Sequence, residues 1–133
     1  MKMKKIKIQY IPCSEKLVVH ADADMVKTII RNFLSNAVKF TPEDKGIEVS
    51  CTREGGMAKI SVRDHGVGIS PERLENIFRK GETTYGTGGE EGSGLGLQLC
   101  QDFAQKNGGE AVVESVLGEG STFSVLVPLK QES

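Results

Sequence analysis

Two glycine-rich segments in the middle of the chain carry the residue types needed to hold a nucleotide. Asp64-His65-Gly66-Val67-Gly68 follows one apolar run, and Gly92 to Leu97 opens another. Clustered glycines typically mark tight turns or a ligand pressed against the backbone. A glycine-rich turn that leads into a helix also binds phosphate, because its free N–H groups and the helix dipole favour an anion. Together the segments predict a nucleotide held between an acidic anchor and a phosphate cradle.

The acidic anchor in this prediction is Asp64. It comes two residues after Val62 in an alternating run, so its side chain is predicted to face the same buried side of a strand. A carboxylate in such a place needs a hydrogen-bond donor, and the amino group of adenine is one. Gly66 and Gly68 would let the backbone approach a flat base. An ordinary Asp-containing turn is the alternative, since short glycine motifs often occur without a ligand.

A third set of polar residues lies on a helix predicted over residues 25–40. Asn32, Asn36 and Phe40 are spaced four residues apart on one stripe of that helix, with Lys39 close by. Amide oxygens can complete the ligand shell of Mg²⁺, and a lysine can meet a phosphate as a point charge. A solvated helix face is the alternative for an isolated pair of asparagines.

The elements that must position these residues follow from the pattern of apolar side chains. Strands are predicted at residues 4–11, 17–21, 47–52, 58–62, 112–116 and 122–127, and helices at 25–40, 71–78 and 95–107. Asp22 or Asp24 is expected to cap the first helix, and Thr41-Pro42 to end it. The order predicts an α/β two-layer sandwich, with a mixed, mostly antiparallel sheet of about five strands and helices on one face.

Composition restricts the class of protein. The 133 residues suffice for a single domain, and 38% hydrophobic with 26% charged residues is typical of a soluble globular chain. A net charge of −1 without a basic stripe argues against nucleic-acid binding. Cys13, Cys51 and Cys100 lack metal-like spacing and are predicted to be buried or free thiols in a reducing compartment. A cytoplasmic location is expected, whether or not the parent protein is anchored in a membrane.

Taken jointly, the motifs resemble those of the catalytic and ATP-binding domain of bacterial sensor histidine kinases, within the GHKL ATPase superfamily. The matching segments resemble the N box at Asn32 to Pro42, the first glycine box at Asp64 to Ile69, the F box at Ile77-Phe78, and the second glycine box at Gly92 to Leu97. The later stretch Gly118 to Phe123 also fits, and the resemblance covers nearly the whole chain.

The resemblance implies roles for the residues of the predicted helix. Asn36 would ligate Mg²⁺, with Asn32 nearby on the metal or the phosphates. Lys39 would contact phosphate, and Phe40 would pack near the nucleoside, where an aromatic residue is usual in the family.

The resemblance also implies roles for the two glycine boxes. Asp64 would accept a hydrogen bond from the adenine amino group. The base pocket would be shaped by Gly66, Gly68 and Ile69, and the phosphates would be cradled by Gly92, Ser93, Gly94, Leu95 and Gly96. Residues 81–91 between the boxes are polar and rich in glycine, which predicts a lid over the nucleotide.

One position separates transfer from hydrolysis in this superfamily. DNA gyrase, Hsp90 and MutL resemble one another in a glutamate four residues before the metal asparagine, and that glutamate acts as a general base toward water. Here the position is Asn32, whose amide cannot take a proton at neutral pH. The resemblance therefore implies phosphoryl transfer, with Asn32 and Lys39 in the catalytic role.

The function implied by the resemblance is binding of ATP with Mg²⁺ and transfer of the γ-phosphoryl group to a histidine in two-component signalling. Residues 1–133 would form one monomeric domain without the phosphoacceptor, which would lie on a helical hairpin of the same parent protein, with a response regulator downstream. A nucleotide-binding module without catalysis stays open, because Arg79-Lys80-Gly81 replaces the second aromatic residue usual in the F box. A GHKL ATPase and a pure interaction domain also stay open.

Overall fold

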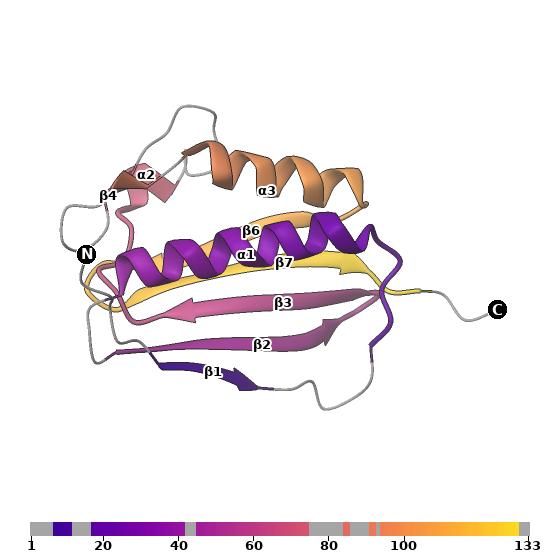
Figure 1. Ribbon diagram of the computed structural model, residues 1–133, viewed down its shortest axis with the longest axis horizontal. Helices are drawn as coiled ribbons and strands as arrows, with labels where there is room; N and C mark the ends of the chain where they lie inside the picture. Colours follow the sequence, from indigo (N-terminus) through magenta and orange to yellow (C-terminus); the bar gives the residue numbers. More distant parts are fainter. Residues whose placement is uncertain are drawn as a thin grey trace.

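Five strands form one mixed sheet in the computed structural model, which describes residues 7–11, 17–41, 45–74, 84–85, 91–92 and 94–130 (Figure 1). The strands are β1 (Lys7–Ile11), β2 (Gly46–Glu54), β3 (Met57–Asp64), β6 (Glu110–Val116) and β7 (Gly120–Pro128). Their spatial order is β1-β2-β3-β7-β6. β1 pairs with β2 in parallel, and the other neighbouring pairs are antiparallel.

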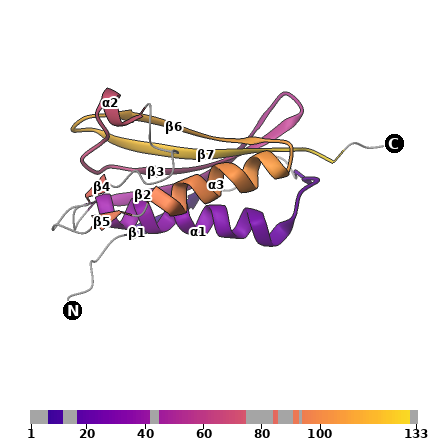
Figure 2. The ribbon, with the colours of Figure 1, turned by 90° about the horizontal axis from the view of Figure 1, so that it is seen from above.

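Two long helices cover one face of this sheet, as the view along its edge shows (Figure 2). They are α1 (Ala23–Phe40) and α3 (Gly94–Lys106). A short helix, α2 (Pro71–Leu74), follows β3, and β4 (Thr84–Tyr85) pairs with β5 (Glu91–Gly92) in a separate two-stranded sheet. The predicted α/β sandwich with helices on one face is therefore confirmed. None of the described helices combines the length and the apolar character needed to cross a membrane.

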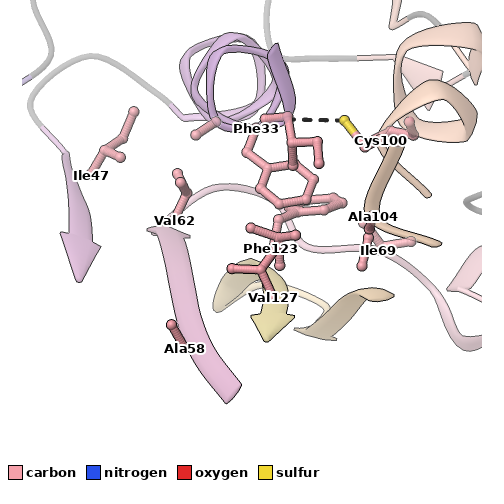
Figure 3. Close-up of a cluster of buried hydrophobic side chains, with 14 residues drawn as sticks. Phe33, Ile47, Ala58, Val62, Ile69, Cys100, Ala104, Phe123 and Val127 are labelled. Atoms are coloured by element: carbon pink, nitrogen blue, oxygen red, sulfur yellow. Dashed lines mark hydrogen bonds between the residues drawn. The ribbon is translucent and has the colours of Figure 1, made fainter. Parts of the chain in front are cut away.

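The core lies between the two helices and the sheet (Figure 3). Phe33 of α1 packs on Phe123 of β7, with ring centroids 5.5 Å apart. The buried apolar side chains come from every layer: Ile29, Phe33, Ala37, Ile47, Ala58, Val62, Ile69, Leu97, Cys100, Ala104, Ala111, Phe123, Val125 and Val127. Aliphatic and aromatic burial of this kind is the main favourable contribution to folding.

The start of α1 and the end of α3 are held together by hydrogen bonds at one end of the sheet. Asp22 caps α1, since its side chain accepts a hydrogen bond from the Met25 N–H at 3.0 Å. Asn107, just after α3, accepts a hydrogen bond from the Asp22 N–H at 2.7 Å. The His20 N–H donates to the Pro128 carbonyl at 2.9 Å. The start of α1 thus lies beside the end of α3 and the end of β7.

These contacts determine the direction of each element. α1 and α3 run antiparallel, and α1 runs with β3, because β3 starts opposite Pro128, beside the start of α1. The C-terminal end of α1, the C-terminal end of β3 and the N-terminal end of α3 therefore lie at the same end of the sheet, as Figure 1 shows.

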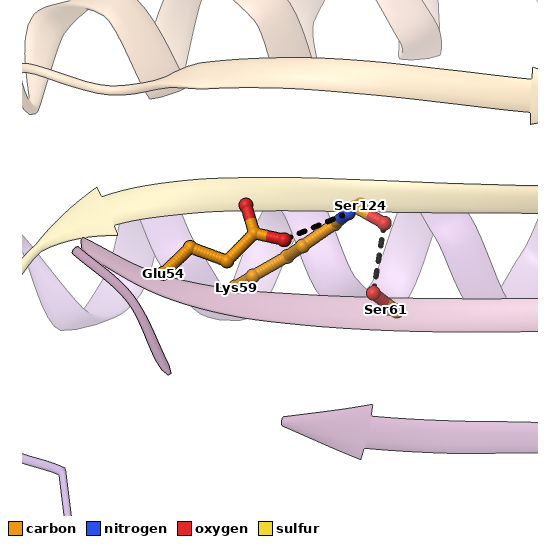
Figure 4. A network of polar contacts seen from close by, with 4 residues as sticks. All are labelled: Glu54, Lys59, Ser61 and Ser124. Atoms are coloured by element: carbon orange, nitrogen blue, oxygen red, sulfur yellow. Dashed lines mark hydrogen bonds and ion pairs between the residues drawn. The ribbon is translucent and has the colours of Figure 1, made fainter. Parts of the chain in front are cut away.

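The other face of the sheet carries small polar contacts (Figure 4). Ser61 and Ser124, which are partners in the β3–β7 register, share a hydrogen bond of 2.8 Å between their hydroxyl groups. Lys59 and Glu54 form an ion pair of 3.5 Å across the β2–β3 hairpin. Partly exposed ion pairs of this type contribute little to stability.

Two predicted elements differ in the structure. The strand predicted at 17–21 is wrong, because this segment forms only the isolated bridge between Val19 and Leu129. Of the strand predicted at 4–11, residues 7–11 are described as β1, with every side chain exposed. A short apolar run is thus not enough to predict a strand when the strands of the sheet already pair with one another.

The region between the glycine boxes also differs in detail. The helix predicted over 71–78 is present at Pro71–Leu74, and its predicted remainder lies outside the described residues, as do Pro42 and the F-box pair Ile77-Phe78. Within the predicted lid, the sequence pattern did not indicate the short β4–β5 pairing. The other lid residues lie outside the described part of the chain.

Candidate functional site

Asp64 is the most unusual polar residue of the core. It ends β3 and is only 1% exposed. Its Oδ1 accepts hydrogen bonds from the N–H groups of Gly66 at 2.9 Å and Ser121 at 3.1 Å. Its Oδ2 is buried and has no hydrogen-bond partner in the part of the chain that the structure describes. An oxygen in this state is set to accept a hydrogen bond from a ligand.

The electrostatic state of Asp64 reflects two opposing effects. Burial raises the pKa of its carboxyl group above the ordinary value, and this effect is the largest. The N–H groups of Gly66 and Ser121, and more weakly His65, lower the pKa by stabilising the carboxylate. The prediction that Asp64 lies on the buried side of its strand is therefore confirmed, and its burial is expected to lower the stability of the ligand-free domain.

The loop after Asp64 is fixed by the β6–β7 hairpin. The Ile69 N–H donates to the Ser115 hydroxyl at 2.7 Å, and the Gly118 N–H donates to the Val67 carbonyl at 2.9 Å. Gly68 has φ +77°, and a Cβ at this position would lie 2.3 Å from the Val116 carbonyl oxygen. Glycine is thus required there by both conformation and contact.

Ser115 and Gly120 contact the Asp64 loop, and the sequence motifs assigned no role to either residue. Besides its bond to Ile69, the Ser115 hydroxyl donates to the Gly120 carbonyl at 2.9 Å and lies 2.7 Å from the Ser121 hydroxyl. A Cβ at Gly120 would lie 2.2 Å from the Asp64 carbonyl oxygen. The resemblance of residues 118–123 to the family was the available signal, but it assigned no contact to the Asp64 loop.

The predicted residues of α1 lie in its second half. Asn36 is buried, with 6% of its surface exposed, and Lys39 is half-buried in the last turn. Asn32 is half-buried, and its amide nitrogen donates to the Thr28 carbonyl at 3.1 Å. Phe40 is the last residue of α1, and its side chain lies outside what the structure describes.

The segment predicted to cradle the phosphates leads into α3. Gly92 ends β5, Gly94 begins α3, and Leu95 and Gly96 fall in the first turn of the helix. Ser93 lies outside the described residues. The first N–H groups of a helix have no partner within it, so the segment can offer them to an anion.

The fold thus brings the predicted residues to one end of the sheet. Asn36 and Lys39 come from the C-terminal part of α1, Asp64 from the end of β3, and Gly94 from the start of α3. The individual roles given to these residues remain predictions. Among the described residues, no three His, Cys, Asp or Glu side chains form a metal cluster. A metal here would depend on amide and phosphate oxygens, which suit a hard cation such as Mg²⁺.

Cys100 joins the middle of α3 to the first half of α1, away from this end of the sheet. Its side chain is fully buried, and its thiol lies 3.8 Å from the Ile29 carbonyl oxygen (Figure 3). Burial raises the pKa of the thiol to about 12, partly offset by a hydrogen bond with Asn32. The thiol form therefore persists at neutral pH.

This burial predicts a difference in thiol reactivity. In the folded chain at pH 8, iodoacetamide is expected to modify the half-buried Cys51 at least tenfold faster than Cys100, because the reactive thiolate is rare at a pKa of about 12. Peptide mass spectrometry over a time course measures both rates. In denaturant the two rates should converge. Equal rates in the folded chain would contradict the packing of Cys100.

Comparison with known proteins decides the family. Residues 21–131 match the model of the histidine kinase-, DNA gyrase B- and HSP90-like ATPase family. The chain belongs to this family. Its curated relatives include named histidine kinases at more than 30% identity over most of the chain.

Two relatives illustrate the match within this ATPase family. Histidine protein kinase DivJ of Caulobacter vibrioides is 47% identical over 118 residues, which cover 86% of this chain and 19% of DivJ. Sporulation kinase C of Bacillus subtilis is 34% identical over 116 residues, which cover 87% of this chain and 26% of the kinase. The chain thus spans about a fifth to a quarter of these relatives.

Solved structures show the same fold. Full-length ShkA in complex with AMPPNP superposes with a TM-score of 0.79 at 31% identity, covering 96% of this chain and 26% of ShkA. The nucleotide-free catalytic domain of histidine kinase ThkA has a TM-score of 0.77 at 28% identity, covering 92% of this chain and 80% of that domain. The chain therefore has the fold of histidine kinase catalytic domains.

Proposed function

We propose that this domain binds ATP with Mg²⁺ and transfers the γ-phosphoryl group to a histidine on a separate dimerisation domain of its parent protein. The phosphoryl group would then pass to a response regulator. The observation that carries the proposal is the Asp64 carboxylate, buried at the end of β3 with Oδ1 held by two N–H groups and Oδ2 unpartnered among the described residues.

Adenine recognition follows from this arrangement. Oδ2 of Asp64 would accept a hydrogen bond from the adenine amino group, which removes the cost of leaving that oxygen buried and alone. Gly68 lets the loop lie directly against the β6–β7 hairpin, and the buried Ile69 would offer an apolar surface to the base. Two hydrogen bonds, from the Ile69 N–H to Ser115 and from the Gly118 N–H to Val67, hold this loop in place before a ligand arrives.

Phosphate binding would use the facing helices. Lys39 supplies a positive charge at the end of α1, and the N–H groups at the start of α3 supply an anion site. Asn36 offers an amide oxygen suited to a bound Mg²⁺, which would neutralise the phosphate charge during transfer. Together these groups would orient the terminal phosphate toward an incoming acceptor.

The chemistry of Asn32 favours transfer over hydrolysis. It occupies the position where hydrolysing relatives carry a general base, and an amide cannot take a proton from water. Its nitrogen donates one hydrogen bond to the Thr28 carbonyl, which orients the amide group, and its oxygen can accept a hydrogen bond or ligate a cation. We expect slow phosphate release in the absence of an acceptor.

A reconstituted transfer reaction tests the proposal. The chain, Mg²⁺ with γ-labelled ATP, and a phosphoacceptor fragment from the same parent protein are mixed, with fragment and chain each omitted in turn. Acid-labile phosphohistidine is expected only in the complete mixture, and faster than release of free phosphate.

Three contrary outcomes would each indicate a different function. Nucleotide binding without phosphohistidine, beside a competent related kinase as control, would support a non-catalytic module. Rapid phosphate release without an acceptor would indicate an ATPase, and absence of nucleotide binding would indicate an interaction domain.

A further inference from the structure

A second buried oxygen at this end of the sheet has no assigned role. Within the described ranges, the buried side-chain oxygens without a hydrogen-bond partner are Oδ2 of Asp64 and Oγ1 of Thr41. Thr41 is the C-cap of α1 and is fully buried. A buried hydroxyl group without a partner destabilises the free protein, so its presence calls for a ligand or a water molecule.

The position of Thr41 follows from the helix period. Ile29, Phe33, Ala37 and Thr41 are four residues apart and fully buried, so they form one sheet-facing stripe of α1. Phe33 packs on Phe123, which is paired with Val62 in the β3–β7 register. The stripe continues from there in the direction in which β3 runs.

Asp64 lies at the same end of the sheet. It comes two residues after Val62 along β3, and it is paired with Ile47, six positions after Thr41 in the chain. Asn36 and Lys39 do not belong to the sheet-facing stripe of α1 that ends at Thr41. The Thr41 hydroxyl is therefore on the adenine side of the candidate site.

We propose that the Thr41 hydroxyl is a second polar anchor for the base of a bound adenine nucleotide, through a direct hydrogen bond or one bridging water. The inference rests on the proposed ATP-binding function and adds a specificity residue to it. The two buried oxygens without hydrogen-bond partners, one at the end of α1 and one on β3, would then both be explained by the bound base.

Substitution of the hydroxyl alone tests this assignment. Titration calorimetry with ADP and with AMP-PNP, both with Mg²⁺, is carried out on the 133-residue chain, its Thr41→Val variant and its Thr41→Ser variant. Thr41→Val is expected to weaken both ligands by about threefold to tenfold, and Thr41→Ser by less than about twofold. Thermal unfolding without nucleotide should show the valine variant to be at least as stable as the parent chain, since no hydrogen bond is lost.

Each contrary result has a definite meaning. Unchanged affinities in Thr41→Val overturn the inference, and a lower melting temperature with unchanged affinity would assign the hydroxyl to a structural water instead. A loss for AMP-PNP alone would place the hydroxyl at the phosphates and overturn the base-side assignment. If the parent chain binds ADP and Asp64→Asn weakens it while Thr41→Val does not, this inference fails and the proposed function stands. If the parent chain binds no ADP, the proposed function fails.

Discussion

Replacing Asp64 by asparagine is expected to weaken ADP binding about tenfold to a hundredfold. The same substitution is expected to raise the free energy of unfolding of the ligand-free domain. The loss of affinity follows because the amide nitrogen would face the adenine amino group, donor against donor, where the carboxylate accepts. Hydrogen bonds to charged groups contribute about 1.5–3 kcal/mol, which sets this range. Titration calorimetry measures the affinity, and urea unfolding measures the stability.

The gain in stability has a defined pH dependence. Burial raises the pKa of Asp64 in the folded state, so the folded state binds the proton more tightly than the unfolded state. The stability that this provides is present below the unfolded pKa and is lost as the pH rises through the folded pKa. The advantage of Asp64→Asn over the parent chain should therefore be small near pH 3 and larger at pH 7.

The control for this substitution is an exposed aspartate. Asp102 lies on α3 with its side chain exposed, so Asp102→Asn should change neither ADP affinity nor the shape of the pH profile. If Asp64→Asn bound ADP as well as the parent chain does, the carboxylate would not be the adenine anchor. If it lowered stability at pH 7, the unpartnered Oδ2 would not be a cost to the free domain.

The second large effect is expected from Gly120→Ala, with a loss of about 2–5 kcal/mol in the free energy of unfolding. Gly120 has φ +122°, and a Cβ there would lie 2.2 Å from the Asp64 carbonyl oxygen. Both the strained conformation and the overpacking against backbone contribute to the loss. Since Ser121 donates its N–H to Asp64, ADP affinity should fall as well. Urea unfolding and calorimetry measure the two effects.

Gly118→Ala provides a matched control in the same turn. Gly118 also has a positive φ of +82°, but a Cβ there would meet no atom within 4 Å in the described chain. Its alanine variant should lose about 1–2 kcal/mol from backbone strain and retain ADP affinity. Equal losses in the free energy of unfolding for Gly118→Ala and Gly120→Ala would show that the close contact with the Asp64 backbone does not affect stability.

Much of the fold could be predicted from the sequence because its signals are local. The apolar spacing on α1, the alternation along β2 and β3 and the glycine turns each act within a few residues. The burial of Asp64 could also be predicted, because a strand period of two places it with Val62. The sandwich then follows from covering one apolar face of the sheet.

The remaining features depend on contacts between distant segments. The bridge of Val19 to Leu129 replaces a predicted strand, because β6 pairs with β7 as far as Leu126 and only the residues after it contact this segment. The hydrogen bond from Ile69 to Ser115 joins residues 46 positions apart, and neither residue signals it alone. Likewise, Thr41 is an ordinary helix-ending residue in the sequence, and its orphaned hydroxyl is visible only in the packed core.

The hydrogen bonds between the Asp64 loop and the β6–β7 hairpin also determine the order in which the domain can fold during synthesis. The bonds from Ile69 to Ser115 and from Ser121 to Asp64 reach 46 and 57 positions along the chain. A chain that has emerged from the ribosome only as far as β3 therefore still lacks the β6–β7 groups that hold the Asp64 loop. Nucleotide would be bound by a finished domain, and a chain truncated before β7 would lose ligand recognition together with its sheet.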